Sequence, residues 1–284
     1  MEKIDRIFIS CDDNPLYMQF LPVVSMAWDK ILGVKPTLAY VTDKPESEWK
    51  WINDYCKGVI RYPIDNNLPN GRCKTFVARL LMRNLFGDDI CMVSDLDMLP
   101  LNAKSFTEIL KGFNRDCLLV FGHNAYEFGD GDPKNKIFDP KLRKFPSCYN
   151  IATSKVWGDI VNPNNINDDD LVKSWYNIEY YDYRESVNKE NFDDECLVRA
   201  LIQKWNPNRD KIIGVDRRME RVGFMSDRLD RSKWRIDINK LKNGDYVDAH
   251  CPRPMNDYLP SVKVLTDYLG IELVILNGGE LCRK

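Results

Sequence analysis

Two aspartates separated by one residue, in Asp95-Leu96-Asp97, are the first group in the sequence that could do chemistry. They directly follow an apolar run, residues 90–93, which is typical of a buried strand. Alternate side chains of an extended segment point the same way, so both carboxylates are expected on one side. At the carboxyl end of a strand in an α/β sheet, such a pair can hold a divalent cation against a phosphate group. A solvated turn is the alternative, because acidic residues are plentiful in this chain.

Histidine is scarce, with His123 and His250 alone in the chain. His250 ends a strand-like run just before a proline-rich segment, and an imidazole there can join carboxylates in binding a metal ion. Arg253 follows closely, and a planar guanidinium binds phosphate oxygens well. Without a carboxylate site nearby, a partly buried structural histidine would be the better interpretation. His123 is expected to be structural or to face a substrate.

Acidic residues open a predicted helix at Asp193-Asp194-Glu195. Asp193 stands where an N-cap is expected, and negative charge there complements the helix dipole. A carboxylate at a helix start beside a cleft can also be a general base or a nucleophile. We assign that catalytic role to Asp194.

Two basic residues, Lys74 and Arg79, lie on a predicted helix that leads toward the aspartate pair. Either side chain could bind a phosphate or a sugar hydroxyl. A solvated helix face is the alternative, and it also suits Arg83 on the same helix.

Short apolar runs and amphipathic stretches alternate through the first half of the chain. Strands are predicted at Arg6–Cys11, Thr37–Thr42, Gly58–Tyr62, Ile90–Val93 and Cys117–Gly122. Helices are predicted at Tyr17–Leu32, which Gly33 would end, Trp49–Cys56 and Lys74–Phe86. This alternation predicts βαβ units and a largely parallel sheet with helices on both faces.

The second half is less regular. A helix is predicted at Phe192–Trp205, a strand at Tyr246–His250, and further strand and helix patterns at Val262–Leu276. Residues 123–146 and 163–170 are polar, and loops of that kind often cover binding sites.

Composition excludes several classes of protein. The chain has 41 basic and 43 acidic residues, and its net charge is -2. This charge provides no positive electrostatic field to attract the phosphates of DNA or RNA, so a dedicated nucleic-acid-binding protein is not expected. A hydrophobic fraction of 44% suits a globular core, and neither a membrane span nor a signal peptide is apparent. Nine scattered cysteines without a C-x-x-C pair indicate reduced thiols in a cytoplasmic protein.

The order of these groups along the chain resembles a known family. The order is Ser10-Cys11-Asp12-Asp13-Asn14, Tyr17, Lys74, Ser94-Asp95-Leu96-Asp97, Tyr149-Asn150, Asp194 and His250. It is similar to that of metal-dependent glycosyltransferases of the GT-A fold, in the layout of the glycogenin-like group, and to soluble enzymes of bacteria or large DNA viruses. The resemblance implies an α/β, Rossmann-like single domain over residues 1–284. About residues 1–122 would bind the nucleotide sugar, and about residues 123–284 the acceptor.

The resemblance also implies roles for residues of the donor site. The loop after the first strand would hold the nucleoside through Cys11, Asp13 and Tyr17. Lys74 would touch the donor, and Arg253 would stand in for a phosphate-binding lysine. Arg79 joins this set from its position on the same helix as Lys74.

Asp95, Asp97 and His250 would hold Mn²⁺, or Mg²⁺, on the nucleoside diphosphate, with Asp95 shared between the metal and the ribose. One imidazole among oxygen ligands favours Mn²⁺ modestly. Asp194 would lie near the transferred sugar. It would deprotonate the acceptor in an inverting enzyme, or stabilise the positive centre in a retaining one.

The expected function is transfer of a sugar from a nucleoside diphosphate, UDP in our hypothesis, to a glycan hydroxyl. A binding protein for nucleotide sugars or glycans that lacks catalysis is the alternative. A phosphatase with a D-x-D motif is less favoured, because its pair normally lies on the first strand. A sugar-nucleotide pyrophosphorylase would need a glycine-rich basic loop after that strand, which Cys11-Asp12-Asp13-Asn14-Pro15 does not provide.

Overall fold

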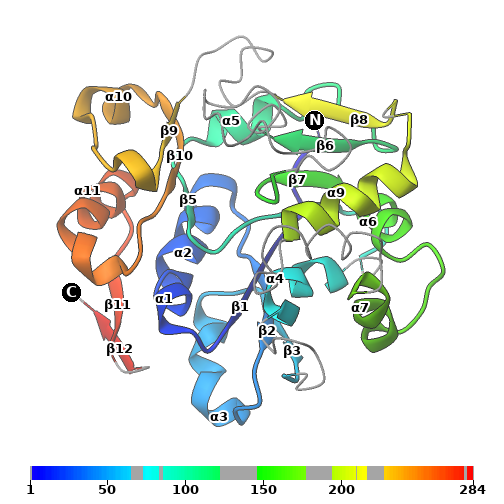
Figure 1. Cartoon of the computed structure of the whole chain (residues 1–284). Coiled ribbons are helices and arrows are strands. Elements are labelled where there is room, and N and C mark those ends of the chain that lie inside the picture. Colours follow the sequence, from blue (N-terminus) through cyan, green and yellow to red (C-terminus); the bar gives the residue numbers. More distant parts are fainter. Residues whose placement is uncertain are drawn as a thin grey trace.

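The computed structural model of the chain (Figure 1) describes residues 2–64, 73–82, 86–121, 146–176, 194–208, 210–215, 227–277 and 280–283. His123, Arg83, Asp193 and nearly all of the predicted 123–146 loop lie outside these ranges. Within them, no helix has the length and apolar character needed to cross a membrane.

A seven-stranded sheet forms the centre of the molecule, in the order β3-β2-β1-β4-β7-β6-β8. Its strands are β1 (Arg6–Asp12), β2 (Thr37–Val41), β3 (Gly58–Tyr62), β4 (Ile90–Val93), β6 (Leu118–Phe121), β7 (Asn150–Thr153) and β8 (Ile212–Val215). Neighbouring strands are parallel except around β7, which is antiparallel to both β4 and β6. The predicted α/β class with a largely parallel sheet is confirmed. β7 and β8 were not predicted.

Both faces of this sheet are buried, as β1 illustrates. Ile7 and Ile9 lie in one hydrophobic cluster and Phe8 lies in another. Since successive side chains of a strand point to opposite faces, a continuous apolar run can be satisfied only when both faces are covered. That requirement explains why helices are needed on both sides.

The helices divide between the two faces. The cluster of Ile7 and Ile9 includes side chains of α2 (Leu21–Leu32), α5 (Ala103–Glu108) and α11 (Leu259–Leu269). The cluster of Phe8 includes side chains of α4 (Cys73–Ala78), α6 (Ser154–Val161), α7 (Asp168–Tyr176) and α9 (Asp194–Trp205). Figure 1 shows α2 and α11 on one side of the sheet and α6, α7 and α9 on the other. Shorter helices are α1 (Pro15–Met18), α3 (Glu46–Trp49) and α10 (Ile238–Asn243), with 3-10 helices η1 (Lys50–Asp54), η2 (Arg79–Met82), η6 (Arg231–Lys233) and η7 (Met255–Tyr258).

The first predicted helix is interrupted. The prediction placed one helix at Tyr17–Leu32, whereas α1 ends at Met18 and α2 begins at Leu21. Pro22 has no N–H to bond to the carbonyl of Met18, and a proline is tolerated only in the first turn of a helix, where it lies in α2. Gly33 ends α2 as predicted, at φ 68°.

Three other predicted boundaries are corrected. The stretch predicted as one helix at 49–56 is α3 followed by η1, and the helix predicted at 74–86 changes into the tighter η2 at Arg79. The predicted polar loop 163–170 ends early, because α7 starts at Asp168. The first turn of α7 contains three aspartates, whose negative charge complements the helix dipole. Because such a polar run is also typical of a loop, the sequence did not predict the start of this helix.

Two small sheets lie outside the central one. β11 (Val274–Asn277) and β12 (Glu280–Arg283) form a hairpin near the C-terminus. The other sheet has the order β5-β10-β9, from β5 (Met98–Pro100), β10 (Tyr246–His250) and β9 (Asp227–Leu229). β10 is antiparallel to β5 and parallel to β9, so the start of β5 and the ends of β10 and β9 meet at one edge.

Candidate active site

The register of the β5-β10-β9 sheet brings three distant polar residues together. His250 pairs with Met98, and the backbone N–H of Cys251 donates to the carbonyl oxygen of Asp97 at 2.8 Å. On the other side, Ala249 pairs with Leu229, so His250 lies beside Asp230. Asp97, Asp230 and His250 therefore line one edge, although they come from opposite halves of the chain.

The Asp95-Leu96-Asp97 segment is a turn and not an extended strand end as expected. The N–H of Met98 donates to the carbonyl oxygen of Asp95 at 3.4 Å, and Leu96 packs into the core. The side chain of Asp97 is 6% exposed and that of Asp95 is 31% exposed. The two carboxylates consequently have different surroundings and different partners.

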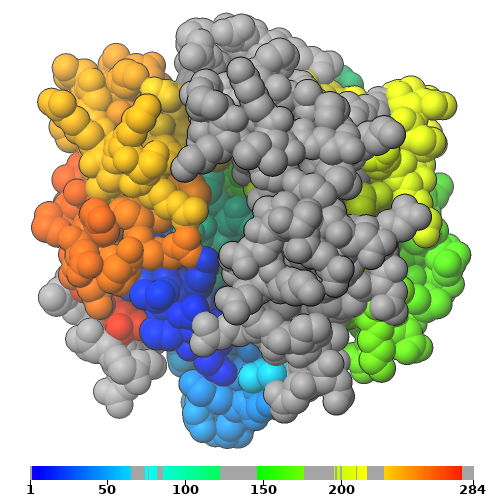
Figure 2. All heavy atoms as spheres, in the orientation of Figure 1, coloured from blue at the N-terminus to red at the C-terminus, as the bar shows by residue number. Residues whose placement is uncertain are grey.

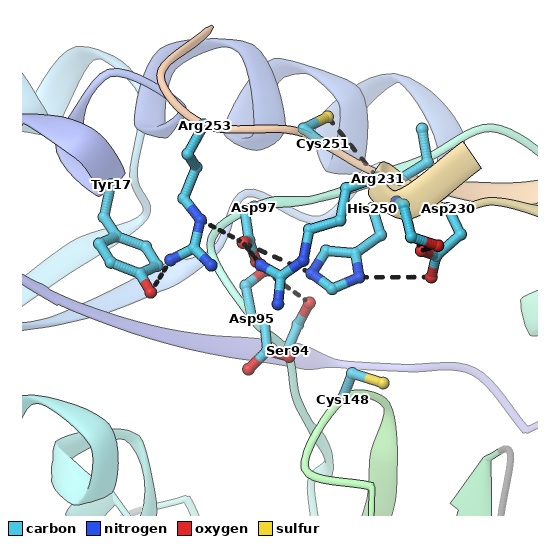
Figure 3. Close-up of polar contacts among 12 residues, drawn as sticks. Tyr17, Ser94, Asp95, Asp97, Cys148, Asp230, Arg231, His250, Cys251 and Arg253 are labelled. Atoms are coloured by element: carbon cyan, nitrogen blue, oxygen red, sulfur yellow. Dashed lines mark hydrogen bonds and ion pairs between the residues drawn. The ribbon is translucent and has the colours of Figure 1, made fainter. Parts of the chain in front are cut away.

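Three cationic side chains reach the same oxygen of Asp97. Its Oδ2 lies 3.5 Å from Nη1 of Arg231, 3.6 Å from Nε2 of His250 and 3.6 Å from Nε of Arg253. Figure 3 shows the three side chains converging on Asp97 from different segments of the chain. The predicted meeting of Asp97 with His250 and Arg253 is present, and Arg231 joins it without having been predicted.

His250 is held between two carboxylates. Its Nδ1 lies 3.8 Å from Oδ2 of Asp230, while Nε2 faces Asp97. Burial lowers the pKa of His250, but hydrogen bonding to Asp230 and Asp97 outweighs burial and raises the pKa to about 9. The same imidazole lowers the pKa of Asp230 well below its ordinary value. Asp230 also accepts from the N–H of Ser232, which anchors its carboxylate at the start of η6.

Asp95 is paired with Arg79. The guanidinium of Arg79 is buried, donates to a carboxylate oxygen of Asp95, and donates to the carbonyl oxygen of Ser94 at 2.9 Å. Burial raises the pKa of Asp95, but the charge and the hydrogen bond of Arg79 outweigh burial and hold the pKa below its ordinary value. Arg79 therefore lies beside the aspartate pair, where it anchors the turn after β4.

Tyr17, near the N-terminus, contacts Arg253, which lies 236 residues later in the chain. Nη1 of Arg253 donates to the hydroxyl of Tyr17, and the guanidinium carbon lies 4.4 Å from the centre of the tyrosine ring. In Figure 2 the orange C-terminal segment lies directly against the blue N-terminal segment, as this contact requires. Arg253 thus links α1 to Asp97.

Asp13 lies in a polar group at the ends of β1 and β2. It accepts from the hydroxyl of Tyr40 at 2.5 Å and from Thr42 at 2.7 Å, and Lys44 lies 3.2 Å away. Burial raises the pKa of Asp13, but these donors outweigh burial and hold the pKa below its ordinary value. The thiol of Cys11 instead faces the core, where it contacts Met18, so only its main chain is left for a ligand.

Lys74 and Asp194 are not seen to join this group. The buried ammonium of Lys74 lies 3.3 Å from Asp169 at the start of α7 and 5.8 Å from the ring of Tyr62. Helix α9 is described from Asp194, and the first two residues of the predicted helix lie outside the described ranges. The side chain of Asp194 lies outside what the structure describes.

A second ion pair on the same two strands was not predicted. Arg228 donates to both carboxylate oxygens of Asp248, at 2.8 and 2.9 Å, and Asp248 is fully buried. The only sequence signal is a spacing of two residues, between Arg228 and Asp230 and between Asp248 and His250. A three-residue strand such as β9 is too short for a recognisable pattern.

The layered sheet, with polar residues gathered beyond the end of β4, is that of the GT-A glycosyltransferase fold. Solved structures support this assignment. The galactosyltransferase LgtC in complex with donor and acceptor sugar analogs aligns with a TM-score of 0.52 at 11% identity, over 93% of this chain and 95% of LgtC. An active-site mutant of LgtC also gives 0.52, at 12% identity over the same shares. Glycosyltransferase GlyE of Streptococcus pneumoniae TIGR4 aligns with a TM-score of 0.49 at 10% identity, over 95% of this chain and 63% of GlyE, and the assignment does not rest on it.

No protein-family model matches the sequence, and no curated protein matches it either. The expected GT-A fold is nonetheless confirmed by the structural alignment with LgtC.

Proposed function

We propose that this protein transfers a sugar from a nucleoside diphosphate donor, a UDP-sugar, to a glycan hydroxyl with the help of Mn²⁺. The observation that carries the proposal is the meeting of Asp97 with His250 at 3.6 Å, beside the arginines and on the GT-A fold. A carboxylate, an imidazole and guanidinium groups at one edge can together hold a cation and a diphosphate.

The side chains at this edge fit a divalent cation. Asp97 and Asp95 offer carboxylate oxygens and His250 offers Nε2, while Asp230 faces its Nδ1 as an orienting carboxylate often does at metal sites. Among the described residues, no three or more His, Cys, Asp or Glu side chains form a ready metal cage. Phosphate oxygens of the donor would therefore supply the remaining ligands. When bound, the cation supplies Lewis-acid stabilisation of the departing diphosphate.

The other residues of the site bind and orient the donor. Arg253 is placed to donate to a phosphate once it turns from Asp97, and Tyr17 holds its guanidinium. Arg79 fixes the turn that carries Asp95. Asp13 offers a carboxylate near the end of β1, where the nucleoside would lie. We assign Asp194 to the sugar, as acceptor base or as stabiliser of the positive anomeric centre.

Removal of Asp97 tests the metal site. We expect Asp97→Ala to abolish the Mn²⁺-dependent thermal stabilisation by UDP, which at one hundred times the dissociation constant is about 2.7 kcal/mol. Asp159→Ala, at an exposed aspartate of α6, is the matched control and should retain it. Undiminished Mn²⁺-dependent UDP binding by the Asp97 variant would refute the metal assignment.

Catalysis is tested separately from binding. Wild-type protein should release free UDP from a UDP-sugar when a glycan acceptor is present, whereas a binding protein without catalysis would release none. Asp194→Asn should keep UDP binding and lose this release. Transfer at the wild-type rate in that variant would remove Asp194 from the mechanism.

A further inference from the structure

One oxygen of Asp97 faces more positive charge than it can satisfy. Arg231, His250 and Arg253 all approach Oδ2, at 3.5–3.6 Å, whereas the bidentate Arg228–Asp248 pair has contacts of 2.8 and 2.9 Å. The long distances show that none of the three is fully bonded to Asp97. Each remains available to a better partner.

Arg231 is the most accessible of the three. Its side chain is 39% exposed, against 25% for Arg253 and 20% for His250. It lies at the start of η6, directly after Asp230, whose carboxylate accepts from the N–H of Ser232 and faces Nδ1 of His250 at 3.8 Å. The guanidinium of Arg231 can leave Asp97 at low cost, because water solvates its exposed side chain and Asp97 keeps its contacts with His250 and Arg253.

This cluster holds no surplus of negative charge before any ligand binds. Asp95 is paired with Arg79, and Asp248 with Arg228. The remaining described carboxylates of the cluster, Asp97 and Asp230, lie among Arg231, Arg253 and His250 (Figure 3). A divalent cation alone would leave an excess of positive charge in a half-buried site, and a diphosphate brings the compensating negative charge.

We propose that Arg231 is a diphosphate-binding residue that exchanges Asp97 for the donor's phosphates when the cation binds, so that cation and diphosphate bind cooperatively. The proposal rests on the proposed function and adds Arg231 to the donor site. Before binding, Arg231 competes with the cation for Asp97. After binding, the same guanidinium donates to the diphosphate.

If Arg231 exchanges partners in this way, replacing it should raise the affinity for Mn²⁺ and lower the affinity for UDP. Without nucleotide, Arg231→Gln should bind Mn²⁺ about two- to fivefold more tightly, because a competitor for Asp97 is gone. With saturating Mn²⁺, the same variant should bind UDP about tenfold more weakly or worse, because a charged hydrogen bond is lost. Mn²⁺ affinity is measured by electron paramagnetic resonance of the free ion, and UDP affinity by calorimetry.

Two further variants serve as controls. Arg231→Lys retains the positive charge and should leave Mn²⁺ affinity near wild type, with UDP binding between those of wild type and Arg231→Gln. Arg235→Gln, at an exposed arginine four positions along, should match wild type in both measurements. Uridine, which has no phosphate, should bind the Arg231→Gln variant as it binds wild type.

Affinities of Arg231→Gln that are unchanged, or that both fall, would overturn the proposal. If wild-type protein binds Mn²⁺ and UDP but Arg231→Gln behaves like wild type, the role of Arg231 is wrong and the proposed function stands. If wild-type protein binds neither, the proposed function fails, and the role of Arg231 fails with it.

Discussion

Strands β9 and β10 carry two polar groups that differ sharply in how they are satisfied. Arg228 and Asp248 form a buried, bidentate pair, and two residues further along each strand Asp230 and His250 belong to the loosely bonded group around Asp97. Both groups use the same strand pairing. The first, which we call the closed pair, has each charge matched by a partner at short distance, and the second, the open group, has ion-pair distances of 3.5–3.8 Å.

The two groups differ in bonding because they lie at different places in the small sheet. The closed pair lies inside the β5-β10-β9 sheet, where an unpaired charge would be costly, so geometry must satisfy both partners. The open group lies at the sheet's edge, where water can solvate a partly bonded guanidinium. We infer that the closed pair holds the strands in register and that the open group acts on ligands.

The largest expected effect is on the closed pair. Asp248→Asn leaves the largely buried guanidinium of Arg228 without its counter-charge, and we expect it to lower the free energy of unfolding by about 3–5 kcal/mol. Chemical denaturation measures this loss. Replacing both partners together, as Arg228→Met with Asp248→Leu, should recover most of the stability. A stable Asp248→Asn variant would show that the pair is not what holds the strands.

A smaller effect is expected at the open group, on metal affinity and not on folding. Asp230→Asn removes the charge that faces Nδ1 of His250, and Mn²⁺ affinity should fall about 10–100-fold. Asparagine can still accept the Ser232 N–H, so the melting temperature should change little. Electron paramagnetic resonance measures the affinity.

Asp237→Asn provides the matched comparison. Asp237 caps α10 as Asp230 caps η6, through hydrogen bonds from the N–H groups of Asn239 and Lys240. It should leave Mn²⁺ binding unchanged. Equal Mn²⁺ affinities in the two variants would count against an orienting role for Asp230.

The smallest effect is expected at Tyr17. Tyr17→Phe removes the hydroxyl that accepts from Arg253 and keeps the ring under the guanidinium, so UDP binding in Mn²⁺ should weaken by about 0.5–1.5 kcal/mol. Calorimetry measures the change, with Tyr268→Phe on the exposed face of α11 as control. A loss as large as that of Asp97→Ala would mean that Tyr17 contacts the donor more extensively than through Arg253.

Much of the central sheet could be predicted because its signal is local. The runs at 58–62 and 90–93 match β3 and β4 residue for residue, and Gly33 ends α2 as expected. The antiparallel β7 and the three-residue strands β5 and β9 were missed, because segments that short carry no recognisable period. Their hydrogen bonds go to partners far away in the sequence.

The candidate site could be predicted in part. Asp97, His250 and Arg253 were chosen for residue type and position, and the structure brings them together. Asp230 and Arg231 could not be chosen, since their importance depends on the neighbour of β9 in the sheet. The thiol of Cys11 was placed in the donor loop but faces the core, because it lies on the apolar side of β1.

By itself the sequence determined the apolar runs that must be buried, the turn residues that end them, and the carboxylates and imidazole that we propose as cation ligands. Only the tertiary structure decided that three short strands pair so that Asp97, His250 and Asp230 share one edge. Apolar patterning and turn propensity are properties of neighbouring residues, whereas strand register depends on backbone hydrogen bonds between segments that folding alone brings together.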